Sequence, residues 1–133
     1  MKFIIAAWIL FVGAPCLARA ERIKVRFSCS CEDQVGARYA TALRDLLASS
    51  PRYTETPYAS EPKGPDSKEK IYHWEIQVVS IDVDDPALGH QSALSVVFMV
   101  DDVLLSHHIQ TCGASVVSQC AATTLASLDK LLN

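Results

Sequence analysis

The chain has 133 residues, of which 15 are acidic and 12 are basic, and half of its residues are hydrophobic. This length fits one domain with its own hydrophobic core. Because the chain is acidic and has no basic cluster, we do not expect it to bind nucleic acid or an anionic membrane surface.

Residues 1–20 have the three parts of a secretory signal peptide. Lys2 supplies a positive charge, residues 3–12 form a short apolar segment, and residues 18–20 read Ala-Arg-Ala, a small-x-small cleavage site. The apolar segment is shorter than a membrane-spanning helix requires. Cleavage after this segment removes two basic residues and no acid, so the net charge changes from −3 to −5. We expect the mature chain, residues 21–133, to be a single periplasmic or secreted domain that is not held at a membrane.

The first half of the mature chain predicts a strand, a helix and a long loop. Residues 21–28 alternate apolar and charged side chains, which is typical of a half-buried strand. Apolar residues recur at helical spacing over residues 33–49 and predict an amphipathic helix. Residues 51–70 hold four of the six prolines and almost no aliphatic residue, so we expect a mobile loop. This loop is either a tolerated insertion or a binding loop whose contact residues are Tyr53 and Tyr58.

The second half predicts three strands and a closing helix. Residues 71–83 form one strand, residues 92–100 and 103–111 form a β-hairpin, and residues 115–132 form an amphipathic helix. The element order is therefore β-α-β-β-β-α. A right-handed crossover makes the first two strands parallel, and the hairpin turns then alternate the strand direction. We expect an α+β fold, a two-layer sandwich of a mixed four-stranded sheet with two helices on one face.

The hairpin turn is expected at residues 101–102, between two apolar runs. A two-residue loop pairs Val96 with His107 and so places His107 on the apolar face of the hairpin. His108 then lies on the opposite, solvated face. The apolar face would otherwise comprise Leu94, Val96, Phe98, Val100, Val103, Leu105 and Ile109.

Four cysteines of the mature chain should gather at one end of the sheet. Cys29 and Cys31 follow the first strand, Cys112 ends the last strand, and Cys120 lies on the helix after it. An exported chain with four cysteines most simply has two disulfides. Of the three pairings we favour bridges that join the first pair to the second, because a Cys29–Cys31 bridge closes a very small ring. A metal or redox site is the alternative, but neither the Cys-x-Cys motif nor the longer spacing fits the usual patterns.

No catalytic motif or cofactor fingerprint stands out, and we expect no cofactor. His73, Glu75 and His108 fall on the predicted outer side of the sheet. They are a candidate metal or acid/base site if their strands are adjacent. A solvated sheet face explains the same residues without any function.

Residues 43–53, LRDLLASSPRY, resemble the helix end of periplasmic domains of the TolB amino-terminal, LpoB and CsgG type. In those domains a strand and a helix also precede a polar connection, further strands and a closing helix. The resemblance implies a non-enzymatic adaptor that contacts a protein partner, whose identity it does not give, in the cell envelope. An inhibitor or immunity-type protein that blocks an enzyme with its acidic surface is the alternative.

Overall fold

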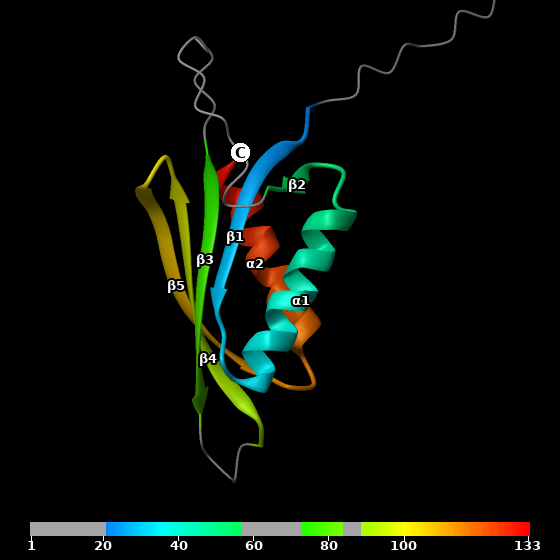
Figure 1. Ribbon diagram of the computed structural model, residues 1–133, viewed down its shortest axis with the longest axis vertical. Coiled ribbons are helices and arrows are strands. Elements are labelled where there is room, and N and C mark those ends of the chain that lie inside the picture. The colour runs from blue at the N-terminus through cyan, green and yellow to red at the C-terminus, as the bar shows by residue number, and fades with distance from the viewer. Residues whose placement is uncertain (1–20, 57–72, 84–88) are drawn as a thin grey trace, which may run out of the picture.

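The computed structural model describes residues 21–56, 73–83 and 89–133 (Figure 1). The expected signal peptide, residues 1–20, and the candidate contact residue Tyr58 lie outside the described residues. Within the described ranges, no helix has the length and apolar character needed to cross a membrane. The elements are β1 (Ile23–Ser30), α1 (Gln34–Ser49), β2 (Tyr53–Glu55), β3 (Trp74–Val83), β4 (Gln91–Val100), β5 (Val103–Gly113) and α2 (Val117–Leu131).

The strands form one mixed sheet in the order β2-β1-β3-β4-β5. β1 is parallel to both β2 and β3, whereas β3, β4 and β5 are joined by antiparallel pairings. Both helices lie on the same side of this sheet (Figure 1). The α+β class and the mixed sheet with two helices are therefore confirmed, and the predicted four strands are corrected to five.

The additional strand, β2, lies inside the segment that the sequence predicts as a loop. Tyr53 pairs with Ile23 of β1, and its side chain is buried. Its hydroxyl donates a hydrogen bond to Asp129 of α2, which also accepts one from Arg52 at 3.0 Å. Tyr53, a candidate contact residue of the predicted loop, is therefore buried in the fold, whereas residues 57–70 of the predicted loop lie outside the described part.

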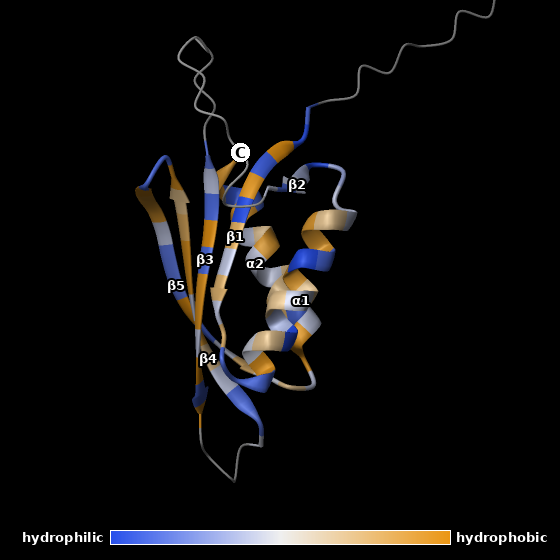
Figure 2. Cartoon of the chain, viewed as in Figure 1, coloured by the Kyte–Doolittle hydropathy of each residue, from blue (hydrophilic) through white to orange (hydrophobic). Residues whose placement is uncertain are grey.

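The hydrophobic core lies between the sheet and the helices. α1 buries Val35, Tyr39, Leu43 and Leu47, which follow one another at helical spacing. Opposite them the sheet contributes buried residues from each of its long inner strands: Val25, Ile76, Val78, Leu94, Val96 and Phe98. Figure 2 shows the hydrophobic colour of α1 and α2 concentrated on parts of each helix, as expected for amphipathic elements.

The predicted two-residue turn is confirmed. Asp101 and Asp102 have φ angles of 48° and 65°, the left-handed conformation that type I′ hairpin turns require at both central residues. Asp101 also accepts a hydrogen bond from the backbone N–H of His73 at 3.0 Å. The carboxylate thus ties the turn to the start of β3.

A β-bulge beyond the turn changes the predicted hairpin register. The shift occurs between Phe98 and Met99, and Val96 consequently pairs with His108 rather than with His107. A shift of one residue turns each following side chain to the other face. His108 therefore lies on the core side, where its ring centroid is 5.8 Å from that of Phe98. Three residues predicted on the buried face are exposed instead: Leu105, His107 and Ile109. Val103 lies before the bulge and keeps its predicted pairing with Val100, but it is exposed as well.

The cysteines pair locally, as Cys29–Cys31 and Cys112–Cys120, with Cα–Cα distances of 5.3 and 6.2 Å. The expected bridges between the two pairs are therefore corrected. β3 and β4 separate β1 from β5, which places those two strands about 14 Å apart at a spacing of ~4.8 Å per strand. A disulfide needs a Cα–Cα distance below about 7 Å. Because α2 turns back beside β5, Cys120 is available to Cys112 instead.

Gly36, in the first turn of α1, lies directly against Ser80 of β3. A Cβ atom at this position would lie 2.1 Å from Ser80 Oγ and 2.6 Å from Ser80 Cβ. We expect Gly36→Ala to lower the free energy of urea unfolding by about 1–3 kcal/mol, because this overlap outweighs the better helix propensity of alanine. Adding Ser80→Gly should recover part of the loss, and equal losses with and without it would contradict the contact.

Candidate interaction surface

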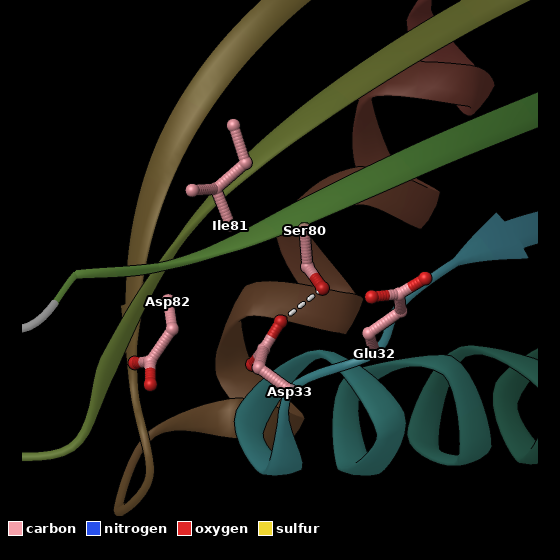
Figure 3. A pocket seen from close by; sticks show the side chains of 5 residues that line it. All are labelled: Glu32, Asp33, Ser80, Ile81 and Asp82. Atoms are coloured by element: carbon pink, nitrogen blue, oxygen red, sulfur yellow. Dashed lines mark hydrogen bonds between the residues drawn. The ribbon is translucent and has the colours of Figure 1, made fainter.

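Among the described residues, one side of the sheet carries no helix, and we call it the outer face (Figure 1). Its residues alternate along β3, β4 and β5 with the buried core residues, and Figure 3 shows Ile81 on the opposite side of β3 from Ser80. The outer face comprises Glu75, Gln77, Val79 and Ile81 on β3, Ala93, Ser95, Val97 and Met99 on β4, and Leu104, Leu105, His107, Ile109 and Thr111 on β5.

Large apolar side chains on the outer face are open to solvent. The exposed fraction is 66% for Ile81, 61% for Leu104 and 69% for Ile109, and Val79 and Leu105 are also exposed. Single exposed hydrophobic residues are common on protein surfaces, but these residues lie on β3 and β5, the two strands that flank β4, and Val79 and Ile109 are level with each other across Ser95. Contiguous exposed apolar patches are typical of interaction sites.

The outer face contains almost no exposed charge. Its single carboxylate, Glu75, is only 6% exposed and accepts a hydrogen bond from Gln77 Nε2 at 2.9 Å. The basic residues Lys24 and Arg26 belong to β1, beside this face. The patch is therefore apolar at its centre and bordered by a basic strand, so the acidic excess of the chain lies elsewhere.

The structure does not assemble His73, Glu75 and His108 into one site. His73 and Glu75 lie on the outer side of the sheet, whereas His108 faces Phe98 on the core side. Burial, and to a smaller extent the charge of His107, lowers the pKa of His108. Among the residues that the structure describes, no group of three or more His, Cys, Asp or Glu side chains is arranged to hold a metal ion.

An acidic pocket of about 430 Å³ lies beside β3 near the start of α1, and its lining comprises Glu32, Asp33, Ser80, Ile81 and Asp82 (Figure 3). Asp33 is the N-cap of α1 and accepts a hydrogen bond from the Gly36 N–H at 2.7 Å. The hydroxyls of Ser80 and Ser92 also donate to it, which ties the start of α1 to β3 and β4. These contacts give Asp33 a structural role at the junction of helix and sheet.

The charge of Asp33 should make the stability of the domain depend on pH. Burial alone would raise the pKa of this carboxyl, but the hydrogen bonds from Ser80, Ser92 and the Gly36 N–H outweigh it and lower the pKa. The unfolded chain then binds the proton more tightly, so this contribution to stability is complete above the ordinary aspartate pKa of 3.8 and is lost as the pH falls through the lower pKa of the folded state.

The test compares urea unfolding between acidic and neutral pH for the unchanged chain, Asp33→Asn and Asp33→Ala. Asparagine is also a good N-cap, so Asp33→Asn should flatten the pH dependence. Asp33→Ala should in addition lose about 1 kcal/mol at neutral pH, because it removes the cap. Parallel pH curves for the unchanged chain and Asp33→Asn would contradict the prediction.

No protein-family model matches this chain, and no curated protein matches it significantly. Residues 43–53, which carry the resemblance to the TolB amino-terminal, LpoB and CsgG type, form the end of α1 and the start of β2. The assignment of a function therefore rests on the surface of this molecule.

The outer-face residues of β5 were not predicted as a contact surface. The predicted register placed Leu105 and Ile109 in the core, and the bulge reverses this. The sequence signal that could have indicated the bulge is the adjacent pair Leu104-Leu105, because successive apolar residues break the alternation of a regular strand.

Proposed function

We propose that this protein is an exported, disulfide-bonded, non-enzymatic binding domain that acts through protein–protein contacts of its outer face. The observation that supports this proposal is the set of exposed apolar side chains of β3 and β5, on a sheet face that no helix of the described ranges covers: Val79, Ile81, Leu104, Leu105 and Ile109. Protein interfaces typically combine an apolar, uncharged centre with a polar rim. The outer face has such a centre, and Lys24 and Arg26 of β1 lie at its border.

The cell envelope or the exterior is the proposed location. The signal-peptide pattern of residues 1–20 supports export, and two paired sets of cysteines are stable in an oxidising compartment. The resemblance of residues 43–53 to periplasmic adaptor-type domains agrees with this location. The partner is then a protein of the same compartment.

Site-specific photo-cross-linking in the producing cells tests the proposal. A photoreactive residue in place of Ile109 should give a protein adduct after irradiation. The same residue in place of Arg38, an exposed position of α1 on the helix side, is the matched control and should give none. If Ile109, Ile81 and Leu104 all give no more adduct than Arg38, the outer face is not a protein-binding surface.

A further inference from the structure

We propose that the Cys29–Cys31 bridge is a redox-active disulfide that oxidises a dithiol in an extended segment of another exported protein. The bridge lies where β1 ends, shortly before the start of α1. This activity is additional to the proposed function and does not use the outer face. Each copy of the chain oxidises one dithiol.

The two disulfides differ in what they connect. Cys112–Cys120 joins β5 to α2, and Cys112 has no exposed surface. Cys29–Cys31 joins residues only two positions apart, at the end of one strand, and therefore links no two elements of the sheet or helices. The pairing of Cys29 with Val78 of β3 holds this part of β1 without the bridge. Reduction of Cys29–Cys31 should therefore leave the sheet in place.

The sulfur atoms of Cys29 and Cys31 are within reach of another thiol. Both residues are half-buried, and Ser30 between them and Glu32 after them are exposed. Thiol–disulfide exchange needs direct access of the attacking thiolate to a sulfur atom, and exposed disulfides are the labile or catalytic ones. The burial of Cys112 protects the other bridge from the same attack.

β1 offers an open edge beside the disulfide. Among the described residues, β2 pairs with β1 only over Ile23–Val25. The N–H of Ile23 donates to β2 at 2.8 Å, and the C=O of Val25 accepts from Thr56 at 3.0 Å. Because backbone groups alternate between the two sides of a strand, the N–H and C=O of Cys29 point to this same side, beyond the end of the β2 pairing. An extended peptide adds as a further strand at such an edge.

The exchange is balanced in two steps. A thiolate of the substrate first attacks Cys31 Sγ and forms a disulfide with it, while the Cys29–Cys31 bond breaks and Cys29 Sγ leaves with the electron pair and takes up a proton. The second substrate thiolate then attacks the substrate sulfur of this mixed disulfide. The substrate's own disulfide forms, and Cys31 Sγ leaves and takes up a proton. Two electrons pass from the dithiol, which is oxidised, to the cysteine pair, which is reduced.

The charges at the start of α1 set the order of the two cysteines. Glu32 and Asp33 directly follow Cys31, and Figure 3 shows both carboxylates beside the first turn of α1. A like charge nearby disfavours a negative charge, so a thiolate costs more at Cys31 than at Cys29. The sulfur that carries negative charge at the lower cost leaves faster. Cys29 therefore leaves first, and Cys31 carries the mixed disulfide.

The purified, oxidised protein, mixed without oxygen with a reduced peptide that contains two cysteines among β-branched and polar residues, tests the inference. We expect the peptide to lose two hydrogen atoms as its disulfide forms. The tryptic peptide that contains Cys29 and Cys31 should gain two, while Cys112–Cys120 stays oxidised. A peptide with one cysteine should instead form an adduct on Cys31, which fragmentation in the mass spectrometer locates.

A second peptide with prolines beside its cysteines is the matched control. Proline cannot donate to a strand ladder, so this peptide should be oxidised about tenfold more slowly. The variant that combines Cys29→Ser and Cys31→Ser should be folded in urea unfolding and should oxidise neither peptide. The mapping of the unchanged chain decides the inference independently of this variant.

Three results overturn the inference. The first is a two-cysteine peptide that keeps both thiols in the presence of the oxidised protein. The second is a reaction that reduces Cys112–Cys120 and leaves Cys29–Cys31 intact. The third is oxidation of the two peptides at equal rates, which would show that the substrate does not add to the edge of β1.

Discussion

Replacing Tyr39 with alanine is expected to lower the free energy of unfolding by about 3–5 kcal/mol. Tyr39 lies on α1 with no exposed surface, and its hydroxyl is 2.6 Å from Thr124 Oγ1 on α2. Gln110 of β5 donates to the same Thr124 oxygen at 3.1 Å. One aromatic side chain thus fills the core and links two helices to the sheet. A small domain is stable by only about 5–15 kcal/mol in total, so the variant should be close to unfolding.

The Tyr39→Phe variant separates the hydroxyl from the ring. Thr124 keeps its contact with Gln110, so we expect a loss of only about 1 kcal/mol. Urea unfolding followed by the fluorescence of Trp74 measures both variants. In a double-mutant cycle with Thr124→Val, the two losses should be less than additive. Additive losses would show that the two hydroxyls do not interact.

The dependence of the free energy of unfolding on high pH tests the burial of Tyr39 a second time. Burial raises the pKa of Tyr39 to about 12, above the ordinary tyrosine value of 10.0. The folded state therefore holds this proton more tightly than the unfolded state, and stability should fall as the pH rises from 10 towards 12. The Tyr39→Phe variant should lose this part of the pH dependence.

Patterns that depend on local periodicity were predicted well. The helical spacing of apolar residues predicted both ends of α1 and both ends of α2 to within two residues. The two-residue break at residues 101–102 gave the turn of the hairpin. In each case the signal is repeated over many residues or fixed by a short, strongly constrained conformation.

Features that depend on a few residues or on distant contacts were not predicted. β2 has three residues, too few for an alternating pattern, and forms where Tyr53 meets Asp129 of α2. The bulge on β5 adds one residue and exchanges the faces of His107 and His108. The outer face depends on this exchange of His107 and His108 and on the position of both helices on the other side of the sheet. The sequence alone therefore predicted only part of this surface.

The disulfides illustrate the same limit, because their pairing depends on the order of the strands. The sequence placed the four cysteines at one end of the sheet but did not show that β3 and β4 separate β1 from β5. The observed bridges close loops with sequence separations of only 2 and 8. In the chain-entropy model such loops stabilise by about 1.5 and 2.5 kcal/mol, whereas each cross-pairing would close a loop worth about 4.5 kcal/mol.

Reduction of both disulfides is therefore expected to lower the free energy of unfolding by about 4 kcal/mol, measured by urea unfolding with and without reductant. Reduction keeps the sulfur atoms in place, so it tests the cross-links without the cavity that a substitution of the buried Cys112 would create. Reducing cross-paired bridges would instead cost more, because the first of them alone closes a loop worth about 4.5 kcal/mol and the second adds the term of a short loop.

Tryptic mapping without reduction identifies the pairing directly. Cleavage after Arg26 and Arg38 leaves Cys29 and Cys31 in one peptide, and no lysine or arginine lies between residues 71 and 129, so Cys112 and Cys120 share another. Local pairing predicts two separate peptides, each lighter than its reduced form by two hydrogen atoms. A single species that contains both peptides and separates only on reduction would show that the bridges join β1 to the β5–α2 segment.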